Sequence, residues 1–243
     1  SPVQMFMDAP REFVYDRNKL YRPANYGGGY SMQEVTMRTG LVKSLNVVTV
    51  DVALQTGLAR IANLANRFGL PKPERYPALA LGTEEVTPLQ LASAYAAFVN
   101  EGRRVDAKAI TSVGEPPAAH TMPSSEEQVV SPTTAYQITN MLSSVIDRGT
   151  ARKARGAVPG TAIAGKTGTS RDGWFVGYSP NLVCVVWIGF DDNKQLGLTG
   201  AEAALPAWAD FMKDAIALRP DLGGLNFECP EGIKFVEIDS ATG

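Results

Sequence analysis

Residues 164–170 read A-G-K-T-G-T-S, and this stretch decides the fold. It continues a short run in which apolar and polar residues alternate, as they do in a β-strand with one buried face. Lys166 is followed at once by Thr167, Gly168 and Thr169. We therefore predict an edge strand that carries one cation and two hydroxyl groups. The glycine between the hydroxyls would let a ligand or another backbone approach closely.

Two motifs fit these residues and imply different functions. Residues 160–167 match the phosphate-binding pattern G-x-x-x-x-G-K-[ST]. Residues 166–168 match K-T-G, which accompanies S-x-x-K and S-D-N in serine enzymes that form acyl intermediates. A phosphate-binding loop needs a buried strand before its first glycine and a helix that begins at the lysine. Instead, the basic segment 152–159 precedes Gly160, and a turn and a second strand pattern follow Thr167, so the context favours K-T-G.

Size and composition exclude several other classes of protein. The chain has 243 residues, of which 44% are hydrophobic; this is enough to bury the core of one domain, or most of a larger one. A net charge of -2 gives no reason to expect a nucleic-acid partner. No apolar run approaches the roughly 18 to 20 residues that span a bilayer. The two cysteines, Cys184 and Cys229, form no C-x-x-C motif, so no metal site is expected.

The only histidine, His120, stands in a proline-rich stretch and is predicted to be an exposed loop residue. Without a histidine base, a Ser-His-Asp or Cys-His mechanism is not available to the chain. Any acyl-transfer chemistry would therefore have to use lysine.

Caps and periodicity predict the helices and strands. Residues 1–30 contain three prolines and three consecutive glycines, and they are expected to form an extended loop. Residues 31–34 read S-M-Q-E, a capping box that predicts a short helix ending near Gly40. Thr87-Pro88 and Ser131-Pro132 each predict a helix start. Further predictions are helices at about 47–57, 58–68 and 207–218, and strands within 103–113 and at 161–167, 174–178, 182–190 and 235–238.

The three strand patterns after residue 160 are joined by short connections, which favour antiparallel pairing. The predicted fold class is therefore α/β of the α+β type, with a mostly antiparallel sheet covered by helices on both faces. We expect one domain over residues 1–223 and a C-terminal tail of the same domain over residues 224–243. The basic run 148–155 is expected to be a solvated face rather than a binding surface.

Ser44 and Asn46 allow two interpretations. Both residue types favour the N-cap position, so they could simply cap the helix that begins near Val47. Alternatively, S-x-N is the second element of the set to which K-T-G belongs, and it occurs here in the required order, before K-T-G. In a turn, side chains two positions apart can face the same side, which would suit a shared site.

Four segments form a longer pattern: residues 87–95 (T-P-L-Q-L-A-S-A-Y), 165–170 (G-K-T-G-T-S), 172–180 (D-G-W-F-V-G-Y-S-P) and 186–192 (V-W-I-G-F-D-D). Together they closely resemble one known family, the class A (bifunctional) penicillin-binding proteins. The resemblance covers about residues 1–240 and is to the C-terminal part of the transpeptidase domain. It implies the fold shared by penicillin-binding transpeptidases and serine β-lactamases.

The resemblance also implies an activity and partners. The domain would be a serine-type DD-transpeptidase that cross-links peptidoglycan stem peptides ending in D-Ala-D-Ala through an acyl-serine intermediate. It would take the stem peptide or its lipid-linked precursor as substrate, would bind β-lactam antibiotics, and would need no cofactor. Its place would be the periplasmic side of the bacterial inner membrane, anchored by a segment outside this chain.

The same resemblance assigns roles to individual residues. Ser44 would relay a proton to the leaving amine, with Lys166 tuning it, and Asn46 would hydrogen-bond the substrate backbone. Thr167 and Thr169 would hold the terminal carboxylate, with Gly168 between them in the substrate-binding strand. The Thr169 amide would supply half of an oxyanion hole.

One element of the family pattern is absent, because no serine in the chain stands three places before a lysine. The closest imitation, Thr150-Ala151-Arg152-Lys153, lies after S-x-N instead of before it. We therefore expect the nucleophile in an upstream part of the same protein and expect residues 1–243 alone to be inactive. A P-loop-like nucleotide-binding protein and a non-catalytic cell-wall-binding scaffold remain as alternatives.

Overall fold

The computed structural model describes residues 1–114, 120–121 and 125–238. Its helices are α1 (Met37–Lys43), α2 (Asn46–Thr56), α3 (Leu58–Arg67), α4 (Pro88–Val99), α5 (Pro132–Arg148) and α6 (Gly200–Leu218), with short 3-10 helices η1 (Tyr26–Gly28), η2 (Pro77–Leu81), η3 (Arg152–Ala154) and η4 (Pro220–Leu222). The strands are β1 (Met5–Asp8), β2 (Phe13–Tyr15), β3 (Lys19–Tyr21), β4 (Gln33–Thr36), β5 (Arg103–Val105), β6 (Ser112–Val113), β7 (His120–Thr121), β8 (Glu126–Gln128), β9 (Ala164–Thr169), β10 (Gly173–Tyr178) and β11 (Val183–Ile188).

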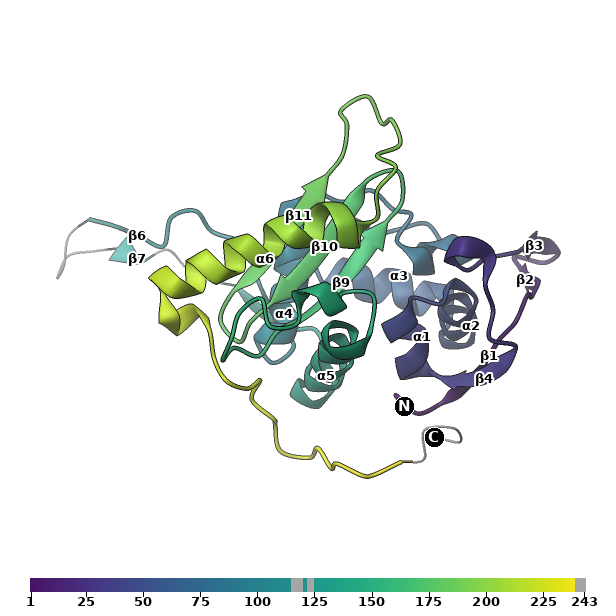
Figure 1. The fold of residues 1–243 in the computed structure, drawn as a ribbon, viewed down its shortest axis with the longest axis horizontal. Helices are drawn as coiled ribbons and strands as arrows, with labels where there is room; N and C mark the ends of the chain where they lie inside the picture. The colour runs from purple at the N-terminus through teal and green to yellow at the C-terminus, as the bar shows by residue number, and fades with distance from the viewer. Residues whose placement is uncertain (115–119, 122–124, 239–243) are drawn as a thin grey trace.

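The centre of the fold is a three-stranded antiparallel sheet in the order β11-β10-β9. Alternate residues of β10 point to opposite faces of the sheet. On one face Phe175 packs against Trp208 of α6, with ring centroids 4.9 Å apart. On the other face Tyr178 contacts Tyr95 of α4, and its hydroxyl lies 2.9 Å from that of Thr139 in α5. Helices therefore cover both faces, as predicted, and Figure 1 shows α6 lying across the sheet.

The predictions for the central sheet and for the starts of α4 and α5 are confirmed. β9 has β10 as its neighbour and forms an edge of this sheet. Helix α4 begins at Pro88 with a complete Thr87–Gln90 capping box, and α5 begins at Pro132 behind the Ser131 cap. Helix α6 begins at Gly200, earlier than predicted, because Thr199 and Glu202 form a capping box and the helix continues through Pro206.

The predictions for the first 40 residues are partly wrong. The expected capping box at Ser31 does not form, because residues 33–36 pair with β1 as strand β4 and Met32 has a left-handed backbone with φ 57°. Helix α1 begins instead at Met37, where the Thr36 hydroxyl accepts a hydrogen bond from the Thr39 amide. Pairing between distant segments outweighs the local capping signal here.

Residues 1–30 are likewise not an extended loop, since they contain β1, the β2–β3 hairpin and η1. Phe6 of β1 and Phe13 of β2 are buried, 4% and 5% exposed, and Phe13 packs in one cluster with Val47 and Val50 of α2. His120 lies in strand β7, not in a loop, and its backbone pairs with Val113. No strand forms at 235–238, where the described tail has no regular structure. Cys184 is partly buried against the core and Cys229 is exposed, and the two do not pair.

Candidate active site

Lys166 lies near the middle of β9, opposite Val176 of β10. The preceding residue, Gly165, has no side chain, which lets β9 lie against β10: a Cβ added to Gly165 would be 2.7 Å from the Val176 carbonyl oxygen. From this position the lysine side chain reaches the helical half of the fold. Its Nζ donates to the Ser44 Oγ at 3.0 Å and to the Thr167 carbonyl oxygen at 2.9 Å.

This contact joins residues 122 positions apart. The predicted proximity of Ser44 and Lys166 is therefore confirmed. The Lys166 side chain remains partly exposed, but its ammonium is sufficiently withdrawn from water that burial lowers its pKa from 10.5 to about 8. An amine of this kind can exchange a proton near neutral pH, which an ordinary surface lysine cannot.

Ser44 owes its direction to the turn between α1 and α2. It is the residue after α1, has a left-handed backbone with φ 56°, and its amide donates to carbonyl groups at the end of that helix. It does not cap α2, whose N-cap is Leu45 without a side-chain hydrogen bond. The capping interpretation is thus wrong for Ser44, and the turn leaves its hydroxyl directed at β9.

Asn46 is the first residue of α2, and its Nδ2 donates to the Ala24 carbonyl oxygen at 2.7 Å. It does not cap the helix either, because the N-cap precedes it. This bond anchors the amide side chain to the segment before η1. Asn46 follows Ser44 by two residues, so the anchor also restrains the turn that carries the hydroxyl.

A buried polar network also restrains the turn between α1 and α2. Asp8, 1% exposed, accepts hydrogen bonds from Asn25 Nδ2 at 2.7 Å and from the Ser31 amide at 2.8 Å. Asn25 Oδ1 in turn accepts from the Val47 amide at 3.3 Å. Burial alone would raise the pKa of Asp8, but the hydrogen bonds from Ser31 and Asn25 outweigh it and the pKa is lowered. Sequence reasoning missed this network, because its members belong to separate segments and share no motif.

The two threonines of K-T-G-T are held by different neighbours. Thr167 Oγ1 lies 2.7 Å from Thr150 Oγ1, which comes from the segment just after α5. Thr169 Oγ1 accepts a hydrogen bond from the Gly200 amide at 3.0 Å, at the start of α6. Each hydroxyl keeps hydrogen-bonding capacity for a ligand, since a hydroxyl has one donor and two acceptor positions. Thr150 was singled out in the sequence only as part of a false nucleophile motif.

Gly168 lies between these threonines and opposite Trp174. The N-terminus of α6 packs directly on it: a Cβ added to Gly200 would lie 2.2 Å from the Gly168 carbonyl oxygen. The backbones of β9 and α6 therefore approach so closely that no side chain would fit at Gly200. We call Ser44, Asn46, Lys166, Thr167, Gly168 and Thr169 the Ser44–Lys166 cluster.

Two other chemistries find no support in this geometry. A P-loop requires a helix that starts at the lysine, whereas the chain here stays extended from Ala164 to Thr169, so the nucleotide-binding interpretation is wrong. Over residues 1–114, 120–121 and 125–238, no group of three or more His, Cys, Asp or Glu side chains could hold a metal ion. In the same ranges no helix is both long and apolar enough to cross a membrane.

Comparison with known proteins agrees with this arrangement. The family model of the penicillin binding protein transpeptidase domain matches residues 2–213. The chain belongs to this family. Penicillin-binding protein 1A of Rickettsia conorii is 35% identical over 279 residues, which cover 100% of the chain and 34% of the relative. The chain thus spans about a third of the length of the curated relatives it matches.

Solved penicillin-binding proteins have the same fold. Penicillin-binding protein 1A of Haemophilus influenzae superposes with a TM-score of 0.87 at 26% identity, covering 100% of this chain and 42% of that one. Penicillin-binding protein A of Mycobacterium tuberculosis, solved as an acyl-enzyme complex with ceftriaxone, gives 0.71 at 25% identity over 88% and 56%. The fold class and the family inferred from the sequence are therefore confirmed, while the roles of single residues stay predictions.

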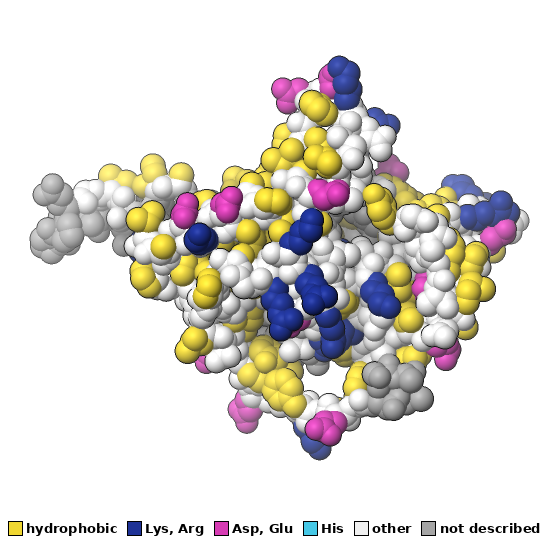
Figure 2. Space-filling view, viewed as in Figure 1, with side chains coloured by type: hydrophobic (Ala, Val, Ile, Leu, Met, Phe, Trp, Pro, Cys, Tyr) yellow, Lys and Arg dark blue, Asp and Glu magenta, His cyan; other side chains and the backbone are white. Residues whose placement is uncertain are grey.

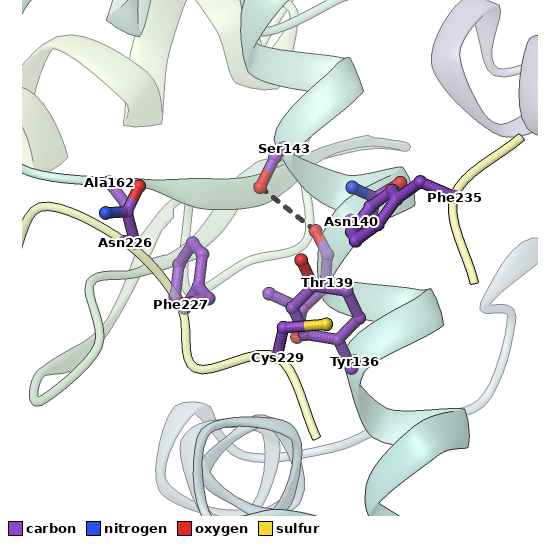
Figure 3. Close-up of a pocket in the computed structure, with 9 residues that line it drawn as sticks. All are labelled: Tyr136, Thr139, Asn140, Ser143, Ala162, Asn226, Phe227, Cys229 and Phe235. Carbon is purple, nitrogen blue, oxygen red and sulfur yellow. Dashed lines mark hydrogen bonds between the residues drawn. The ribbon is translucent and has the colours of Figure 1, made fainter. Parts of the chain in front are cut away.

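A separate recess of about 370 Å³ lies between α5 and the C-terminal tail. Tyr136 of α5 and Phe227, Cys229 and Phe235 of the tail surround it in Figure 3. No member of the Ser44–Lys166 cluster lines it. Around this recess the tail packs through aromatic side chains: Phe235 contacts Tyr136 of α5, and Phe227 contacts Tyr178 of β10.

Proposed function

We propose that the protein is a DD-transpeptidase that cross-links peptidoglycan stem peptides ending in D-Ala-D-Ala and is acylated by β-lactams. The observation that carries the proposal is the 3.0 Å contact between the Lys166 ammonium and the Ser44 hydroxyl. It joins a lysine of lowered pKa to a hydroxyl that can pass a proton on. The family and the acyl-enzyme complex of the Mycobacterium tuberculosis relative support the same reaction.

In the first half-reaction a serine Oγ attacks the penultimate carbonyl carbon of the stem peptide. An ester bond forms, the amide C–N bond breaks, and D-Ala leaves as an amine that needs a proton. The Ser44 hydroxyl would deliver this proton, Lys166 would replace it through their hydrogen bond, and the proton lost by the attacking serine would restore the Lys166 ammonium. In the second half-reaction the amine of a neighbouring stem attacks the ester, so a new amide bond forms and the serine is released.

The remaining members of the cluster would bind the substrate. The hydroxyls of Thr167 and Thr169 lie on one face of β9 and can donate to the terminal carboxylate, with the Lys166 charge close by. Gly168 lets the substrate backbone approach the strand. The Asn46 amide would hydrogen-bond the peptide, and the Thr169 amide would donate to the oxyanion.

The attacking serine is not a member of the Ser44–Lys166 cluster. No S-x-x-K motif occurs in the 243 residues, and relatives are about three times as long as the chain. We propose that an upstream segment of the same protein supplies the nucleophile next to Ser44 and Lys166. The proposed location is the periplasmic side of the inner membrane, where the substrate peptides are, with any membrane anchor in that other part of the protein.

Labelling with a fluorescent penicillin tests the proposal. The protein that includes the upstream segment should be labelled on one serine before residue 1, as located by peptide mass spectrometry. Lys166→Met should slow labelling roughly 100-fold or more, because the variant removes the charge and the proton donor together. The matched control Lys213→Met replaces an exposed lysine of α6 and should change the rate less than about twofold.

Each result separates the alternatives. A label on a serine within residues 1–243 would refute the upstream nucleophile. Absence of any label on the folded longer protein would refute the transpeptidase and favour a non-catalytic cell-wall-binding scaffold. Circular dichroism at pH 7 checks that Lys166→Met is folded, which we expect because the substitution removes a partly buried charge.

A further inference from the structure

Five exposed cations surround the segment that follows α5. They are Lys43 at the end of α1, Arg148 at the end of α5, and Arg152, Lys153 and Arg155 in and after η3. In Figure 2 Lys and Arg side chains gather near the centre of the face shown, in the region between α5 and α6 in Figure 1. We call these five residues the basic surface.

The basic surface adjoins the Ser44–Lys166 cluster. The Thr150 amide donates to the Val42 carbonyl oxygen at 3.3 Å, which places Lys43 beside the end of α5. Thr150 also contacts Thr167 of the K-T-G-T strand, with 2.7 Å between their hydroxyl oxygens. Cations from α1, α5 and η3 therefore lie near Thr150, the residue that contacts the proposed substrate-binding strand β9.

The cations of this surface outnumber the acids near them. Within the described ranges, none of the five cations forms an ion pair with a carboxylate. The acids near it are Asp147, exposed at the end of α5, Asp8, whose pKa the Lys43 charge helps to lower, and Glu202, whose pKa is lowered mainly by hydrogen bonds from Thr199 and further by the Lys153 charge. Like-charge groups held together without forming ion pairs favour binding of an anionic partner.

The nearby Arg38 is affected by the positive charge of this surface. The pKa of Arg38 is lowered, mainly by burial and further by the charge of Arg148. Its guanidinium donates to the Asn140 carbonyl oxygen and the Ser144 hydroxyl of α5, which supply no negative charge. Arg38 thus adds to the positive region from beneath the surface.

We propose that the basic surface binds the carboxylates of a polymeric peptidoglycan strand. At the same time a stem peptide of this strand, or of a neighbouring strand, occupies the Ser44–Lys166 cluster. This inference rests on the proposed function, since it names a second contact for the same substrate. The chemistry recognised is a row of peptide carboxylates on a long chain. A row of fixed cations suits such a ligand because several weak contacts on one chain reinforce each other.

The shape of the surface favours a peptide over a membrane as its partner. Arg155 borders a polar recess of about 450 Å³ whose other walls include Asp147, Thr161 and Asn226. A concave recess can admit a side chain, whereas a plane of lipid headgroups would stay outside it. Asp147 beside Arg155 also suits a stem peptide, which by the proposed reaction carries amines as well as carboxylates.

Binding of uncross-linked glycan strands that bear stem peptides tests the inference. The protein with its upstream segment is first acylated with penicillin, so that the cluster is blocked and only the second contact is measured. The variant Arg152→Ala/Lys153→Ala/Arg155→Ala should bind these strands about tenfold more weakly at low salt. Raising the salt from about 0.05 M to about 0.5 M should remove most of the difference.

A matched triple variant and two further ligands complete the design. Arg60→Ala/Lys72→Ala/Arg75→Ala removes three exposed cations outside the basic surface and should bind like the wild type. Strands whose carboxylates are converted to methylamides should bind the wild type as weakly as the first variant binds native strands. Penicillin should acylate the first variant at the wild-type rate, because the small inhibitor needs only the cluster.

The outcomes distinguish this inference from the proposed function. Equal strand binding by both triple variants would overturn the basic surface as a peptidoglycan contact while leaving penicillin acylation intact. Loss of binding to vesicles of phosphatidylcholine and phosphatidylglycerol, with unchanged strand binding, would overturn it in favour of a membrane contact. Failure of penicillin to label the wild type would refute the proposed function itself, and strand binding can then still be measured on the unlabelled protein.

Discussion

The Ser44–Lys166 cluster is built from two sides that are held together by different forces. The helical side, residues 1–56, positions Ser44 and Asn46 through a buried polar network around Asp8 and Asn25. The sheet side, β9 to β11 with α6, positions Lys166 through an apolar core in which Phe175 and Trp208 are fully buried. One hydrogen bond, from Lys166 to Ser44, connects the two sides directly.

The difference shows what each kind of packing can determine. Apolar contacts are strong in sum but without direction, so they fix where β9 lies relative to its neighbours. Hydrogen bonds are directional, and buried ones are costly to leave unmade, so they fix how the Ser44 turn faces the strand. Substitutions on the sheet side should therefore reduce stability most, and those on the helical side should alter the turn.

Trp208→Ala is expected to have the largest effect. The indole is fully buried against Phe175, its Nε1 donates to the Gly177 carbonyl oxygen, and its loss would leave a cavity beneath β10. The free energy of unfolding should fall by about 3 to 5 kcal/mol, as measured by urea denaturation. Phe211→Ala on the same helix removes a half-exposed ring and should cost less than about 1 kcal/mol. Similar costs for both would contradict an apolar sheet side.

The pH dependence of stability should reveal the withdrawn ammonium of Lys166. Its pKa in the fold is about 8, against 10.5 when exposed, so between these pH values only the unfolded chain holds the proton. Stability contributed by this site therefore rises as the pH increases from about 8 to about 10.5. Relative to Lys166→Met, the wild type should gain about 2 kcal/mol between pH 7 and pH 10. Parallel pH profiles for the two proteins would show that the lysine is solvated.

Asp8→Ala should disturb the helical side more than the sheet side. It removes the acceptor of the Ser31 amide and one of the two acceptors of Asn25 Nδ2, which keeps only its bond to the Gly29 carbonyl oxygen; this should cost about 2 kcal/mol in urea denaturation. Hydrogen exchange should speed up for amides near the Ser44 turn and stay slow in β10. Asp16→Ala removes an exposed carboxylate from the β2–β3 turn and should change neither measurement appreciably. Uniform loss of protection across both sides would mean that the network is not local.

Asp172→Ala should have the smallest effect, although the residue makes two short hydrogen bonds. Asp172 accepts from the Trp187 indole and from the Ser170 hydroxyl, each at 2.6 Å, in the turn that joins β9 to β10. Because Asp172 is only partly buried and its bond to Trp187 lies at the surface, water can replace the carboxylate, and the cost should be about 0.5 kcal/mol. A loss as large as that of Asp8→Ala would show that burial does not separate the two networks.

Local patterns predicted the strands of the sheet side well, and also the starts of α4 and α5, the helices that cover one face of the sheet. Thr87-Pro88 and Ser131-Pro132 start helices as expected, and the strands at 164–169, 173–178 and 183–188 follow the predicted apolar runs closely. Each of these signals acts within a few residues, through a capping hydrogen bond or an alternating burial pattern. The family resemblance also came from this part of the chain, where three of its four segments lie after residue 160.

The same rules failed at the start of the chain. Ser31 and Glu34 have the spacing of a capping box, yet residues 33–36 form a strand because β1 is available to pair with them. Such pairing depends on a segment more than 20 residues away and leaves no mark within the motif itself. Asp8 and Asn25 were missed for the same reason, since their hydrogen bonds exist only after β1 and η1 have folded beside α2.

The sequence by itself determined the family, the strand that carries Lys166 and the order of S-x-N before K-T-G, because these depend on neighbouring residues alone. Only the tertiary structure decided that Ser44 takes a left-handed turn, that its hydroxyl meets an ammonium 122 positions away, and that burial lowers the pKa of that lysine. These properties arise from how the two sides pack, and packing sums many contacts between segments that no short stretch of sequence records.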